Sequence, residues 1–209
     1  MFRRLALSSV LAIALPLGAA AQQAAVPGPG PQELIQLTAQ KVLDALESDR
    51  DDYRNDPKKV NTLVDEVVLP HFDTDYSAQL VLGKHWRTAS AGQKKRFVDA
   101  FYHSLLNKYG AALASFTGDN LIMLPFRGDL SSGRATVKTE VKTTDGTRVP
   151  VNYSMRATPE GWKAWDITIE GISYVKNFRT DFGSEIEQRG LDAVIARLES
   201  EAGADHGAG

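Results

Sequence analysis

The segment 162–173, WKAWDITIEGIS, constrains the fold more than any other part of the chain. Apolar and polar residues alternate along it, so that two sets face opposite ways: Trp165, Ile167 and Ile169 against Asp166, Thr168 and Glu170. A sheet that is apolar on one side must be covered on that side by other elements. We therefore expect helices over the apolar face, and we expect the function at that interface.

Three further segments read as strands. They cover residues 121–126, 135–141 and 149–155, and the last two alternate in the same way. A turn at Asp145-Gly146 and another at residues 158–161 provide short connections between strands. The sequence therefore predicts a four-stranded antiparallel sheet.

Helices are expected before and after these strands. Pro31 can start a first helix, Asp56-Pro57 a second, and Ser90-x-x-Gln93 is a capping box. The helix that follows Ser90 carries two apolar stripes, so it is buried on two sides or faces a cavity on one. After Ser173 the pattern returns to helix up to residue 200. The predicted fold is α+β, in a single domain, with a curved sheet covered by helices from the N-terminal half and the C-terminus.

The N-terminus has the pattern of a bacterial secretory signal peptide. Arg3 and Arg4 precede an apolar stretch at residues 5–17, and small residues end at Ala21. We expect cleavage after Ala21, export to the periplasm, a disordered leader at residues 22–31, a domain at 32–200 and a flexible tail at 201–209. The chain has no cysteine and a formal net charge of −2, which excludes disulfides and gives no support to nucleic-acid binding.

Motifs for catalysis and for metal binding are sparse. The sequence has no phosphate-binding loop, no G-x-S-x-G elbow and no H-E-x-x-H. His71, Asp73 and Asp75 are the best candidate metal ligands, but nothing completes their set, and carboxylates near a helix start are more often there to stabilise its N-terminus. We expect no catalytic residues, no metal and no cofactor.

An acid/base pocket is the enzymatic alternative. Tyr153 with Asp166 and Glu170 would be its residues. The alternation directs both carboxylates away from the apolar face, so we interpret them as solvated groups on the opposite face.

Four segments resemble one known family, in their order and spacing. They are VVLPHF at 67–72, AQLVLGKHW at 78–86, FVDAF at 97–101 followed by Tyr109-Gly110, and W-x-x-W-D-I-x-x-E-G-I-S at 162–173. Together they resemble MlaC, a periplasmic phospholipid-binding component also called a toluene-tolerance auxiliary protein. The resemblance extends over roughly residues 31–200.

The resemblance implies a soluble carrier that shuttles phospholipid and keeps the outer membrane asymmetric. Its implied partners are an outer-membrane lipoprotein–porin complex and the membrane-anchored substrate-binding subunit of an inner-membrane ABC transporter. The bound phospholipid is cargo, with its acyl chains in an apolar cavity between sheet and helices. We expect a monomer.

The expected lining of that cavity comes from the apolar faces of sheet and helices. The chosen residues are Val64, Val67, Leu80, Val81, Phe97, Phe101, Leu105, Tyr109, Tyr153, Met155, Trp165, Ile167 and Ile169. Two alternatives stay open: the isomerase-like pocket enzyme, and an adaptor of the transporter that has a solid core and carries no lipid.

Overall fold

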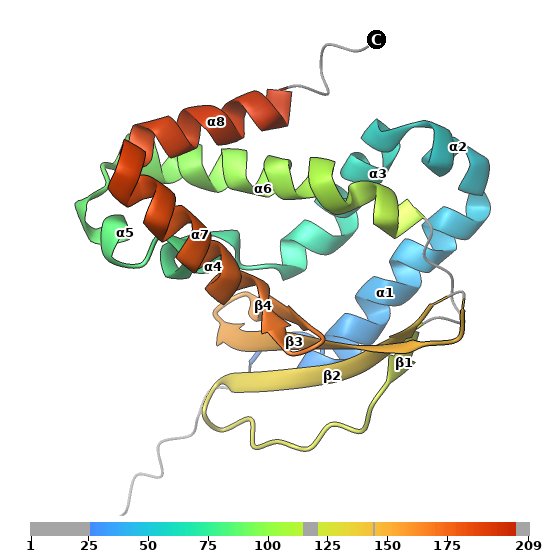
Figure 1. Cartoon of the computed structure of the whole chain (residues 1–209). Coiled ribbons are helices and arrows are strands. Elements are labelled where there is room, and N and C mark those ends of the chain that lie inside the picture. The colour runs from blue at the N-terminus through green and yellow to red at the C-terminus, as the bar shows by residue number, and fades with distance from the viewer. Residues whose placement is uncertain (1–25, 115–120, 144, 204–209) are drawn as a thin grey trace, which may run out of the picture.

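The computed structural model describes residues 26–114, 121–143 and 145–203 (Figure 1). The predicted signal peptide, residues 22–25 of the predicted leader and residues 204–209 of the predicted tail lie outside these residues. The helices are α1 (Pro31–Ser48), α2 (Arg50–Asn55), α3 (Pro57–Leu63), the π-helical η1 (Val64–Val68), the 3-10 turn η2 (Leu69–His71), α4 (Thr74–Leu82), α5 (Lys84–Thr88), α6 (Ala91–Ala114), α7 (Tyr174–Arg189) and α8 (Leu191–Gly203). The strands are β1 (Leu121–Met123), β2 (Arg134–Lys142), β3 (Arg148–Thr158), β4 (Gly161–Ile169) and β5 (Ile172–Ser173).

The α+β prediction is confirmed, but the sheet has five strands and not the four predicted. All neighbours are antiparallel, in the order β1-β2-β3-β4-β5. The additional strand arises because Glu170, at φ 51°, and Gly171, at φ 83°, reverse the chain so that Ile172 pairs with Ile169. Glycine tolerates this left-handed backbone region without strain. The sequence pattern predicted one strand over 162–173, where the structure has β4, a turn and β5.

One face of the sheet packs on α1, and we call it the inner face. Leu34 and Ile35 of α1 are buried against strand residues from β2, β3 and β4: Val137, Met155, Trp162 and Ala164. In Figure 1 α1 runs from the sheet up to the end of the molecule where α2 and α3 lie. Its second half joins another cluster, formed by Val42 and Leu46 with Leu63 of α3.

A β-bulge in β4 changes which residues share a face. Met155 is opposite Ala164 and Ser154 is opposite Asp166, so Trp165 is an extra residue without a register partner. Trp165 therefore lies on the outer face, away from α1. There it packs against the apolar cluster around Phe97 that the helices form. The prediction that Trp165 shares a face with Ile167 and Ile169 is wrong, because one inserted residue resets the alternation.

Helices α4, α6, α7 and α8 form a helical layer around one apolar cluster. Four phenylalanines make its centre: the rings of Phe97 and Phe101 stack at 5.5 Å between centroids, and those of Phe178 and Phe182 stack at 5.8 Å. Val194, Ile195 and Leu198 of α8 are at most 1% exposed beside them. Among the described residues, no helix combines the length and the apolar character that crossing a bilayer requires.

Local start signals of helices are confirmed where the structure describes them. Asp56 accepts a hydrogen bond from the backbone N–H of Lys58 at the start of α3. Ser90 and Gln93 form the expected reciprocal capping box at α6. The π-helical η1 and the 3-10 turn η2 follow α3 directly and carry helical turns through Pro70.

Asp166 is buried, with 4% of its surface exposed, and not solvated as predicted. Its carboxylate accepts hydrogen bonds from the Ser173 hydroxyl at 2.6 Å and from the backbone N–H of Val175 at 3.0 Å. The alternation gave the correct face for Asp166. Helix α7 folds back over that face and covers the carboxylate.

Candidate functional site

The expected lining residues fall into three separate parts of the structure. Those in or against the helical cluster are Leu80, Val81, Phe97, Phe101, Leu105 and Trp165. Those on the inner face are Tyr153, Met155, Ile167 and Ile169. Val64 and Val67 lie on η1, and Val67 packs against the Val42 cluster. The side chain of Tyr109 lies outside the described residues.

Val81, Phe97 and Phe101 are buried in the helical core, whereas Leu80, Leu105 and Trp165 pack against it and are half-buried. Val81 is 1% exposed and Phe97 is 0% exposed. Such close burial in a cluster that joins four helices is what the interior of a domain shows. The inner face and η1 are the other two places where expected lining residues lie.

The inner face changes character along its strands. Near the start of α1 its residues are fully buried, as Val137 and Met155 show at 1% exposure each. Farther along, the apolar residues are only half-buried: Val141, Val149, Tyr153, Ile167 and Ile169. Val67 and Val68 of η1 are half-buried as well. Apolar surface is thus left partly accessible on this part of the inner face and on η1.

Tyr153 brings a hydroxyl group into this apolar region. Burial raises the pKa of its hydroxyl, and a hydrogen bond with Thr139 opposes that rise only in part. Thr139 itself is 0% exposed, and its hydroxyl donates to the Val151 carbonyl at 2.8 Å. The Tyr153 hydroxyl is thus in an apolar setting, although the side chain as a whole keeps some accessible surface.

A second hydroxyl group of interest belongs to Thr38, which lies on α1 between the two apolar clusters of that helix. Its hydroxyl oxygen is buried and has no hydrogen-bond partner among the described residues. A buried hydroxyl without a partner is costly, so its position needs an explanation.

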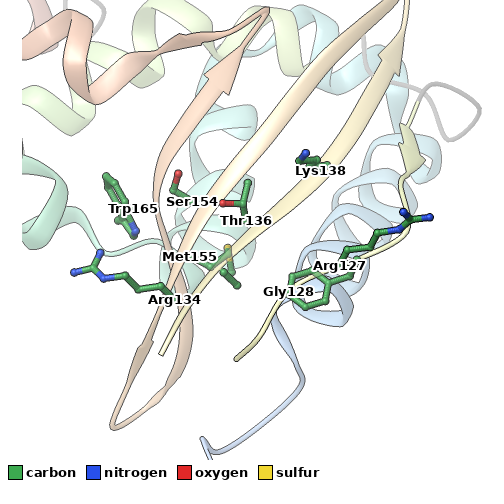
Figure 2. Close-up of a pocket in the computed structure, with 10 residues that line it drawn as sticks. Arg127, Gly128, Arg134, Thr136, Lys138, Ser154, Met155 and Trp165 are labelled. Atoms are coloured by element: carbon green, nitrogen blue, oxygen red, sulfur yellow. The ribbon is translucent and has the colours of Figure 1, made fainter. Parts of the chain in front are cut away.

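Pockets in the described residues include the following two. One, of about 230 Å³, lies in the helical layer with Phe101, Leu105, Phe178, Phe182 and Leu198 among its lining residues. At its rim Arg197 binds Glu185 through two nitrogens, at 2.7 and 2.9 Å, and this hydrogen bonding holds the pKa of Glu185 below its ordinary value. The other, of about 360 Å³, lies mainly over the outer face (Figure 2).

The residues of the enzymatic alternative do not come together. Tyr153 belongs to the inner face, whereas Asp166 lies on the outer face with its oxygens bonded to Ser173 and Val175. Glu170 is exposed in the turn between β4 and β5. No acid/base pair of the expected kind is formed by these three residues.

The three metal-ligand candidates have structural partners instead. The Asp73 carboxylate caps α4 by accepting from the backbone N–H of Tyr76 at 3.1 Å, and it also pairs with Arg156 at 3.1 Å. Burial and the positive charges of Lys41 and Lys163 lower the pKa of His71. In the part of the chain that the structure describes, no group of three or more His, Asp or Glu side chains is arranged to hold a metal ion.

Sequence reasoning missed the contribution of α1 to the inner face. Leu34, Ile35 and Thr38 lie on the side of α1 that carries its buried residues. Helical periodicity from Pro31 onward identifies this face, but it does not indicate which strand residues the face meets.

Comparisons with known proteins agree on one family. The family model described as MlaC protein matches residues 36–200. The toluene tolerance protein ttg2D of Pseudomonas putida is 28% identical over 184 residues, which cover 88% of this chain and 82% of that protein. The intermembrane phospholipid transport system binding protein MlaC of Haemophilus influenzae is 22% identical and covers 82% of each chain.

A solved structure shares the fold. It is the phospholipid-binding protein of Ralstonia solanacearum in complex with a phospholipid, which superposes with a TM-score of 0.78 at 26% sequence identity. The similarity covers 84% of this chain and 98% of that protein. With the family match spanning most of the sequence and the fold in agreement, this chain belongs to the MlaC family.

Proposed function

We propose that this protein binds a phospholipid and carries it through the periplasm between the outer and inner membranes. The observation that supports this most strongly is the family match together with the similarity to a protein solved with phospholipid bound. We propose that the bound lipid is cargo and leaves unchanged, and the phospholipid bound to the solved relative supports this.

The half-buried part of the inner face is our proposed acyl-chain site. Tyr153, Ile167 and Ile169 from the sheet and Val67 from η1 offer apolar surface there. The unpartnered Thr38 hydroxyl is a suitable donor for a lipid ester oxygen. Of the residues chosen from the sequence, we keep the half-buried Val67, Tyr153, Ile167 and Ile169. We assign the others to structural packing: Val64, Leu80, Val81, Phe97, Phe101, Leu105, Met155 and Trp165.

Physical chemistry requires that both acyl chains be enclosed. Each CH₂ group contributes about 0.8 kcal/mol on burial, and a two-chain phospholipid has on the order of 30 of them, so water opposes its free passage by roughly 24 kcal/mol. The 230 Å³ helical pocket is below the roughly 300–1,000 Å³ of ordinary ligand sites, so it does not suffice for such a cargo.

The partners proposed for this carrier are membrane complexes. We propose that it collects or delivers lipid at an outer-membrane lipoprotein–porin complex and at the membrane-anchored subunit of an inner-membrane ABC transporter. Its similarity to a binding protein of an intermembrane phospholipid transport system supports this proposal. Residues 1–21 would direct export and then be removed. We propose that it acts as a monomer.

Solvent extraction of the purified mature protein followed by mass spectrometry tests the function. We expect about one phospholipid per chain in the wild type, little in Ile169→Asp on the inner face, and a normal amount in the control Leu37→Asp, whose position on α1 is 47% exposed. Circular dichroism checks that both variants are folded. A folded wild-type protein without lipid would contradict the carrier and favour the adaptor.

A further inference from the structure

The 360 Å³ pocket is a shallow groove over the outer face of β2 and β3, closed on one side by the segment 126–128. We call it the outer groove. Ten residues line it: Phe126, Arg127, Gly128, Arg134, Ala135, Thr136, Lys138, Ser154, Met155 and Trp165. None of them is acidic and three are cationic, in a chain whose formal net charge is −2.

Two hydroxyls occupy the centre of the groove. Thr136 and Ser154 are directly opposite each other in the β2–β3 register, which brings their Cβ atoms to about 4.5–5.5 Å. Figure 2 shows them side by side on neighbouring strands, with Trp165 on one side of them and Lys138 on the other. Neither hydroxyl has a hydrogen-bond partner among the described residues, so both can donate to a ligand.

Two cations flank these hydroxyls along β2. Arg134 and Lys138 are each two residues from Thr136 on the same face, which is a separation of about 6–7 Å along the strand. Within the described part of the chain, neither of them has a carboxylate partner. The groove thus presents positive charge at both ends of a pair of free hydroxyl donors.

The position of Arg134 is electrostatically unfavourable without a ligand. Its register partner across the sheet is Arg156, and like charges directly opposite each other are destabilising. The Asp73 carboxylate offsets the charge of Arg156 in an ion pair at 3.1 Å between Oδ2 and Nε. The Arg156 guanidinium also lies over the Tyr76 ring, 4.4 Å from its centroid. Arg134 gains only a neutral contact, as its guanidinium donates to the Tyr76 hydroxyl at 3.3 Å.

Aromatic side chains bound the groove. Phe126 lines it on one side, and Trp165 on the other is held edge-on to Tyr76 at 5.7 Å between ring centroids. Phe126 and Trp165 thus form apolar walls beside the exposed Arg134, Thr136 and Lys138. The β-bulge in β4 is what brings Trp165 to this face.

We propose that the outer groove binds a phosphate group. A carboxylate has two oxygens, whereas a phosphate can accept from the Arg134 fork, Lys138 and both hydroxyls at once. The phosphate comes from a lipid headgroup at a membrane surface or from a small soluble phosphate. Because the groove lies on the face opposite to α1, this site is separate from the proposed acyl-chain site on the inner face.

Titration of ¹⁵N-labelled protein with inorganic phosphate tests the site. We expect saturable shifts of the amide signals of Thr136 and Ser154, and binding weaker by about tenfold or more in the double variant Arg134→Gln/Lys138→Gln. The double variant Lys58→Gln/Lys142→Gln removes the same charge from exposed positions outside the groove, and we expect it to bind as the wild type does. Thr136→Val, a change of similar shape, should also weaken binding and serves if the first variant does not fold.

Vesicles distinguish the two sources of phosphate. Sedimentation is compared between phosphatidylcholine vesicles and vesicles with added phosphatidylglycerol. Binding to the anionic vesicles that is lost in Arg134→Gln/Lys138→Gln assigns the groove to headgroups in a bilayer, and phosphate shifts without vesicle binding assign it to a soluble phosphate.

Either of two results would overturn the proposal. The first is the absence of a saturable response at Thr136 and Ser154 together with vesicle binding that the groove variants do not change. The second is an equal loss in the Lys58→Gln/Lys142→Gln control, which would show attraction to net charge alone. Co-purified lipid should be unchanged in the groove variants, so this outcome is separate from a failure of the carrier function.

Discussion

Asp166 connects the last long strand to the first turn of α7. Its two oxygens accept one hydrogen bond each, from Ser173 and from the backbone of Val175, in a site that is 4% exposed. Ser173 in turn caps α7 by accepting from the backbone N–H of Lys176 at 3.1 Å. The carboxylate that the sequence suggested as a catalytic candidate thus has a structural role.

The substitution Asp166→Asn should destabilise the protein. The neutral amide has one acceptor oxygen where the carboxylate has two charged ones, so one of the two donors loses its acceptor and the other keeps only a neutral one. We expect a loss of about 1–3 kcal/mol in the free energy of unfolding, measured with urea. Glu170→Gln, in the exposed turn of the same segment, should change it by less than about 0.5 kcal/mol. Equal effects of the two substitutions would contradict the assignment.

Residue-level predictions succeeded where the interaction is local. The capping pair of Ser90 and Gln93 and the cap at Asp56 depend on residues two or three positions apart, and both are confirmed. The burial of Asp166 depends on α7 folding back over β4, and no pattern within 162–173 contains that information.

At the level of elements, the bulge in β4 decides what each side of the strand does. Trp165 and Asp166 meet the helices, while Ile167 and Ile169 remain on the inner face. Simple alternation through WKAWDITI fits an unbulged strand equally well, so the sequence could not locate the extra residue. The four-strand prediction failed in the same segment because a two-residue strand is too short for any alternation to show.

This division of β4 can be measured by comparing Trp165→Ala with Ile167→Ala. Trp165→Ala should lower the free energy of unfolding by about 3 kcal/mol, because it leaves a hole beside the helical cluster. It should leave the rate of phospholipid release to acceptor vesicles within about twofold. Ile167→Ala removes apolar contact at the proposed acyl-chain site, so we expect release to be faster by about tenfold.

The opposite ranking in lipid release would contradict this prediction. It would mean that the acyl chains contact the outer-face side of β4 and that Ile167 is ordinary packing.

At the level of the whole molecule, the arrangement of helices around one antiparallel sheet could be predicted from the sequence. The division of the apolar residues between packed core and ligand site could not. Hydrophobic periodicity identifies which residues are buried, as Phe97, Val81 and Ile195 illustrate. It does not indicate whether a residue packs against another side chain or against a ligand. Of the thirteen residues chosen as one lining, the twelve whose side chains the structure describes are therefore divided between two clusters, η1 and the half-buried part of the inner face.

The polar residues of the outer groove likewise show that periodicity does not predict which side chains from different strands come together. Arg134, Thr136 and Lys138 alternate plainly in the sequence, which places them on one face of β2. Their meeting with Ser154 and Trp165 depends on the register between strands and on the bulge. Such long-range juxtapositions come only from the assembled fold.

Photo-cross-linking tests the central claim most directly, because it reports both the ligand and its position. A photoreactive amino acid is placed at Ile167, on the inner face, and in a second protein at Leu37, on the exposed side of α1. After irradiation of protein purified with its native cargo, intact-mass spectrometry should detect a phospholipid adduct at position 167 and none at position 37. No adduct at position 167 in folded protein, or equal adducts at both positions, would contradict a phospholipid held on the inner face of the sheet.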